Sequence, residues 1–77
     1  MENSQCIDVR VDYYRNGDFF PISFIDVYGK TYYIRGIKKI ENRFITLKKF
    51  EKLYFCITAQ KDVLLVMIDD KWYLKEE

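Results

Sequence analysis

Residues 6–17 read CIDVRVDYYRNG, and this stretch sets the expected fold. Apolar side chains alternate with charged ones, a period of two that is typical of a strand with one buried face. Asn16-Gly17 follows, and both residues tolerate the positive φ that a tight hairpin turn requires. The chain therefore begins with a strand and a hairpin turn. The buried face of this strand is predicted to carry Ile7, Val9, Val11 and Tyr13.

The rest of the chain repeats this arrangement of apolar stretches separated by turn residues. Gly29 and Asp69-Asp70 mark turns, and Gly36 lies where a barrel strand often bends. A change of face after Phe24 indicates a bulge or a strand covered on both sides. Strands are expected over Phe19–Val27, Thr31–Ile40, Leu53–Gln60, Val63–Ile68 and a last short segment with Trp72 and Leu74. In the expected strand Leu53–Gln60, the inward residues are predicted to be Leu53, Phe55, Ile57 and Ala59.

Composition agrees with a small β domain. The 77 residues include seven Tyr and six Phe, and strand-forming types dominate. Turn signals about every 8–12 residues and no long helical pattern predict a mainly antiparallel all-β fold. We expect a five- to six-stranded SH3-like barrel or rolled sheet, formed by one domain over 1–77 with frayed termini at 1–5 and 76–77.

The stretch Glu41–Lys52 has the least regular pattern. Phe44, Leu47 and Phe50 are spaced to line one face of a short helix, whereas Arg43–Lys49 could instead form an extra strand. We favour an irregular connection that contains one turn of helix.

The order of these motifs resembles a family of short bacterial all-β domains of unknown function. The similarity covers about residues 7–75 and includes Asn16-Gly17-Asp18, Pro21-Ile22-Ser23-Phe24, Tyr28-Gly29-Lys30-Thr31-Tyr32 and the closing Lys71-Trp72-Tyr73-Leu74. Similar segments also occur at the carboxyl end of some Y-family-polymerase-like DNA-repair proteins. The family has no established activity, so the resemblance implies no site residues and only an association with nucleic-acid proteins.

Several chemistries are excluded or disfavoured by composition. The chain has no histidine, which removes the commonest general base and most zinc sites. It has no glycine-rich phosphate loop, and Asp62 and Asp69-Asp70 are best explained as turn residues. We therefore expect a protein that is not an enzyme and that has no catalytic, metal or cofactor site.

The cysteines and the apolar runs bear on location. Two cysteines, Cys6 and Cys56, do not make a disulfide framework, and MENSQC does not resemble a signal peptide. No apolar run is long enough to span a membrane as a helix. A cytoplasmic protein with reduced thiols and no membrane partner is expected.

Charge is concentrated in residues 35–52. Seven cations there stand against two acids, a local balance of +5 in a chain whose net charge is +1. Cations interleaved with aromatic residues are how small barrels hold single-stranded nucleic acid, and an acidic protein surface would use the same charges. A binding module is the favoured function, with the candidate contact residues Arg35, Lys38, Lys39, Arg43, Lys48, Lys49 and Lys52.

The second unusual feature is the continuously apolar strand Val63–Ile68. If Val63, Leu65 and Met67 point inward, the intervening side chains need another cover. That cover could be residues 41–52 folded over the sheet or a second copy of the chain. Self-association as a homodimer is thus the alternative function, with Leu64, Val66 and Ile68 as its candidate residues.

Overall fold

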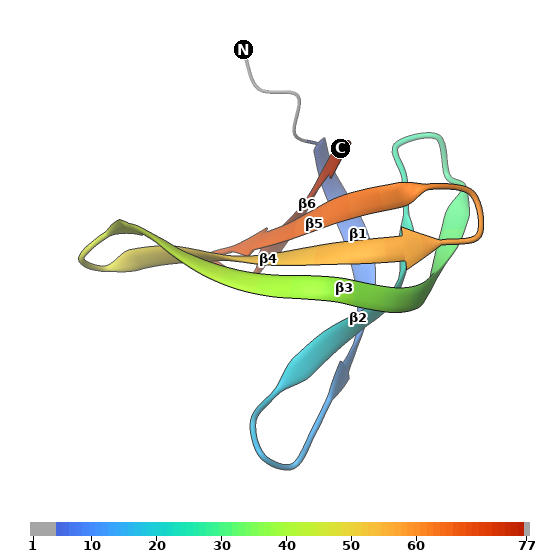
Figure 1. Ribbon diagram of the computed structural model, residues 1–77. Helices are drawn as coiled ribbons and strands as arrows, with labels where there is room; N and C mark the ends of the chain where they lie inside the picture. The colour runs from blue at the N-terminus through green and yellow to red at the C-terminus, as the bar shows by residue number, and fades with distance from the viewer. Residues whose placement is uncertain (1–4, 77) are drawn as a thin grey trace.

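In the computed structural model, which describes residues 5–76, the chain forms a closed antiparallel barrel (Figure 1). Each strand pairs with the next along the chain, and β1 closes the barrel on β6 through Gln5–Ile7 and Trp72–Leu74. The predicted all-β, SH3-like barrel is confirmed. Its strands are β1 (Gln5–Tyr13), β2 (Phe19–Ile25), β3 (Thr31–Thr46), β4 (Lys49–Thr58), β5 (Asp62–Ile68) and β6 (Lys71–Glu76).

Strand β3 serves two sheets in succession. Its first residues, Thr31–Tyr33, pair with β2, whereas the pairing with β4 starts at Ile34. The change of partner coincides with a register shift between Ile34 and Gly36, so the predicted bend at Gly36 is confirmed. Beyond this bend, among the described residues, β3 pairs with β4 along one edge and has no strand paired along the other.

The predicted turns are present and their backbone explains the residue types. Gly17 and Gly29 have φ of 96° and 86°, and Asp69 and Asp70 have φ of 52° and 65°. Aspartate is one of the few residue types that tolerates this left-handed region. In the β2–β3 turn, the Asp26 carboxylate accepts the backbone N–H groups of Tyr28 and Lys30, both at 2.9 Å.

The core lies inside the barrel and is largely aromatic. Tyr54 is fully buried, its ring lies 5.5 Å from that of Trp72, and its hydroxyl donates a 2.7 Å hydrogen bond to the Phe19 carbonyl. Burial raises the pKa of Tyr54 to about 12. The buried cluster comprises Ile7, Phe24, Tyr32, Tyr54, Cys56, Val63, Leu65, Trp72 and Leu74.

The expected helical turn within 41–52 is wrong. Strand β3 continues to Thr46, residues 47–48 turn, and β4 starts at Lys49. Phe44 and Phe50 face each other across this hairpin with ring centroids 6.1 Å apart. Their spacing in sequence imitates a helical face, but cross-strand pairing of aromatic and β-branched residues stabilises the extended form.

The inward face predicted for β4 is also wrong by one residue. Tyr54, Cys56 and Thr58 point inward, whereas Ile57 is exposed. Both faces of this strand carry apolar residues, so alternation alone could not choose between them. Leu53 is buried, but on the outer face of the sheet.

Three boundaries differ from expectation. The bulge in β2 lies at Ile22, opposite Arg10 and Val11, and the strand ends at Ile25 because Asp26 starts the turn. Tyr13 is 77% exposed because β1 continues into a projecting hairpin. Gln5 and Glu76 belong to strands rather than to frayed ends, and residues 1–4 and 77 lie outside the described part of the chain.

Candidate interaction surfaces

The positively charged segment continues into the projecting end of the β3–β4 hairpin, residues 41–52, which we call the hairpin arm. The arm projects from the barrel body, as does the β1–β2 hairpin in another direction (Figure 1). The Cα positions extend over 37 × 36 × 19 Å, a flattened shape that reflects these two projections. The arm is therefore an accessible element and not a loop folded over the core.

Most cations of the predicted binding set already have acidic partners within the chain. Their ammonium or guanidinium nitrogens lie 2.7–3.5 Å from carboxylate oxygens. The hydrogen bond from Lys39 holds the pKa of the Glu41 carboxyl below its ordinary value, so this acid stays charged. The ion pairs are Lys38–Asp62, Lys39–Glu41, Arg43–Glu51 and Lys49–Asp69.

The three remaining cations are not gathered into one site. Lys52 lies over the rings of Phe19 and Tyr54, with its nitrogen 4.8 and 5.7 Å from the centroids. Arg35 and Lys48, at opposite ends of β3 and its turn, have no ion-pair partner among residues 5–76. The seven predicted residues therefore form a partly neutralised stripe along the arm and not a continuous polyanion site.

The tip of the arm carries apolar side chains that the barrel does not cover. Phe44 is 80% exposed, Leu47 is fully exposed, and Ile45 and Phe50 are each about half exposed. In the turn between them, the Thr46 hydroxyl accepts the Lys48 backbone N–H at 3.3 Å. The sequence had suggested that Phe44, Leu47 and Phe50 line one face of a short helix. They lie instead on an exposed hairpin, which makes the tip a candidate contact surface.

Residues 41–52, one of the two covers that the sequence suggested, do not cover the outer face of β5. Val63 and Leu65 are in the core, so Leu64, Val66 and Ile68 point outward as expected. Val66 nevertheless has 0% exposure, because it lies between Leu53 of β4 and Tyr73 of β6 in register across the sheet. Residues 41–52 do not fold over it. The row of neighbouring side chains gives the cover, and Leu64 and Ile68 stay partly accessible.

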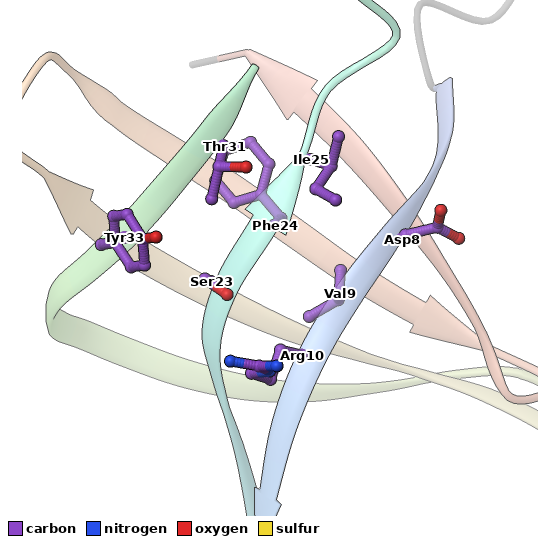
Figure 2. Close-up of a pocket in the computed structure, with 8 residues that line it drawn as sticks. All are labelled: Asp8, Val9, Arg10, Ser23, Phe24, Ile25, Thr31 and Tyr33. Atoms are coloured by element: carbon purple, nitrogen blue, oxygen red, sulfur yellow. The ribbon is translucent and has the colours of Figure 1, made fainter. Parts of the chain in front are cut away.

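A groove of about 420 Å³ that the sequence did not reveal runs along the outside of β2 (Figure 2). Ser23 forms its floor, and the longer Arg10 and Tyr33 side chains, in register on β1 and β3, form its walls. Asp8 and Thr31 line it further along. Cross-strand register places a small residue between two long ones, which a single sequence does not show. The lining carries one cation and one anion and so has no net preference for a polyanion.

Side chains that could support catalysis are scattered. No group of three His, Cys, Asp or Glu that could hold a metal occurs among the described residues. Asp69 and Asp70 form the β5–β6 turn, which agrees with their interpretation as turn residues. Cys6 is exposed and Cys56 is buried, and neither forms a disulfide.

Comparison with known proteins adds no identity to this geometry. No family model, no curated protein and no solved structure matches the chain. Within residues 5–76 there is also no helix of the length and apolarity needed to cross a membrane.

Proposed function

We propose that this chain is a cytoplasmic, non-catalytic interaction module that binds a polypeptide through its hairpin arm. The observation that carries the proposal is the exposed apolar tip, where Phe44, Ile45, Leu47 and Phe50 project from the barrel. A barrel of this size needs nearly all of its large apolar side chains for its own core. Exposed apolar side chains also occur elsewhere on the barrel, but four gathered around one turn form a patch that folding does not explain.

The charge pattern favours a polypeptide over nucleic acid. Binding to a phosphate backbone depends on unpaired cations that release counterions. Here Lys38, Lys39, Arg43 and Lys49 already neutralise acids of the same chain. An apolar tip with cations beside it, Lys48 among them, suits a protein surface that presents apolar area together with carboxylates.

Self-association through Leu64, Val66 and Ile68 has weaker support as an alternative. Val66 is already covered by its neighbours on the sheet, so this face does not require a second copy to bury it. Leu64 and Ile68 keep partial exposure, which a change to a charged residue can test.

The experiment is a selection of displayed random peptides on the immobilised protein, with fluorescent single-stranded and duplex DNA tested in parallel. We expect peptides that combine apolar residues with Asp or Glu, and binding that falls about tenfold or more in the Phe44→Ser/Leu47→Ser variant. Lys71→Ser, a change of an exposed residue on β6, is the matched control. Salt-sensitive DNA binding without peptide binding would assign the arm to nucleic acid, and binding of neither would refute the proposal.

A further inference from the structure

The hairpin arm has a long unpaired strand edge. From Ile34 to Thr46, β3 pairs only with β4 among the described residues, and β2 leaves it after Tyr33. In Figure 1 this part of β3 runs along the outer margin of the β3–β4–β5 layer and out into the arm. An open edge presents a row of backbone N–H and C=O groups that can pair with another strand.

The regular part of that edge is short and well defined. Register shifts occur between Ile37 and Lys39 and again between Phe44 and Thr46, while Lys39–Phe44 pairs with β4 without interruption. Bulges at both ends limit where another strand can pair. The exposed edge of β2, by contrast, contains Pro21, which has no N–H to offer.

We propose that the occupant of this edge is a second copy of the chain, paired antiparallel about a two-fold axis at Asn42. This proposal rests on the proposed function, since it names one polypeptide that the arm binds. Around that axis Glu41 of each copy lies opposite Arg43 of the other, and Ile40 lies opposite Phe44. Residues directly opposite in an antiparallel pair have Cβ atoms about 4.5–5.5 Å apart, close enough for both contacts.

The charges along β3 select this register. Lys39, Glu41 and Arg43 share one face of the strand, as their alternation with the inner-face residues requires. Moving the axis to residue 41 would set Glu41 against Glu41, and moving it to residue 43 would set Arg43 against Arg43. An axis at Ile40 would pair Lys39 with Glu41 but would draw in the bulge at Ile37 and Lys39. Only the axis at Asn42 combines opposite charges with uninterrupted pairing.

The same pairing covers apolar area that the single chain leaves exposed. Ile40 is 37% and Phe44 80% exposed, and each would gain the other as a cross-strand neighbour. Because the contact is the same surface on both copies, pairing through this edge closes as a dimer. Lys39 would then lie opposite Ile45, which brings each arm beside the other copy's barrel.

The first test is sedimentation velocity from low to high micromolar protein concentration. Wild type is expected to dimerise, and Glu41→Lys or Arg43→Glu alone to raise the dissociation constant about tenfold or more, because each sets like charges opposite. An equal mixture of the two variants is expected to recover a heterodimer. The cations at positions 41 and 43 of the Glu41→Lys copy then face the carboxylates at positions 43 and 41 of the Arg43→Glu copy. Arg43→Glu also removes the ion pair of the buried Glu51, so Arg43→Glu/Glu51→Gln serves if circular dichroism shows misfolding.

A cross-link tests the register directly. Asn42→Cys in a Cys6→Ser background places a thiol on the two-fold axis, where mild oxidation is expected to give a disulfide-linked dimer. Thr46→Cys in the same background is the control, because residue 46 would face residue 38 and not itself. Efficient cross-linking of the control with none at residue 42 would overturn the proposed axis.

Other outcomes separate this inference from the proposed function. A monomer at every concentration overturns the dimer, yet peptide binding that depends on Phe44 and Leu47 would leave the proposed function standing. A dimer that resists both charge reversals but is lost in Leu64→Glu also overturns the inference, and assigns self-association to the outer face of β5 instead.

Discussion

The barrel body and the hairpin arm use the same residue types in opposite ways. In the body, lysines lie over buried rings: Lys30 and Lys61 lie 5.1 and 5.7 Å from the Tyr32 centroid. At the tip of the arm, Phe44 follows Arg43 and Leu47 precedes Lys48, but both apolar side chains remain uncovered. Aromatic and cationic content alone therefore does not mark a binding surface. What separates Tyr32 from the tip is that the fold covers its ring.

The largest difference is expected from one substitution made in both regions. Leu65→Ala removes a fully buried side chain and is expected to lower the free energy of unfolding by about 2–5 kcal/mol. Leu47→Ala removes the same atoms from a fully exposed position, so its effect should stay within about 0.5 kcal/mol. Urea denaturation at a concentration where the protein is monomeric measures both. Equal losses would contradict the division into body and arm.

A smaller effect is expected where the arm joins the body. Tyr54→Phe removes the hydroxyl that donates to the Phe19 carbonyl and should cost about 0.5–1.5 kcal/mol. The same hydroxyl gives a pH signature. Because the pKa of Tyr54 rises from 10.0 to about 12 on folding, the folded state retains a proton that the unfolded state loses between those values.

Stability should therefore fall as pH rises from 10 towards 12. Denaturation measured across this range is expected to show a shallower decline in Tyr54→Phe than in wild type. Identical slopes for the two proteins would mean that Tyr54 is not the titrating group.

The smallest resolved effect is expected from the cation over the rings. Lys52→Met keeps the alkyl stem but removes the charge above Phe19 and Tyr54, at a cost of about 0.5–1 kcal/mol. Lys48→Met in the turn of the arm is the matched control and should change stability by less. A larger loss at residue 48 would show that the turn, and not the aromatic contact, holds the arm.

Turn chemistry and alternation predicted much of the fold because both are local. Gly17, Gly29 and Asp69-Asp70 adopt the left-handed backbone that their residue types suggest, and β1 alternates as predicted as far as Val11. The arm was missed because Phe44 and Phe50 are six residues apart in sequence yet directly opposite in space. Their helical spacing concealed a cross-strand pair.

The candidate site was predictable only in part for a similar reason. The cluster of cations was visible in the sequence, but two of the acids that pair with it are distant along the chain. Asp62 lies 24 residues from Lys38, and Asp69 lies 20 residues from Lys49. No local pattern shows that pairing. The same limit applies to the Ser23 groove, whose walls come from three strands.

We infer that the tip side chains serve contact and not folding. The unfolding free energy of Phe44→Ser/Leu47→Ser, measured at a concentration where wild type is monomeric, tests this directly. We expect it to match wild type within about 1 kcal/mol, because both side chains are exposed in the folded chain. A loss of about 2–5 kcal/mol, as expected for Leu65→Ala, would contradict the account and make the tip part of the core.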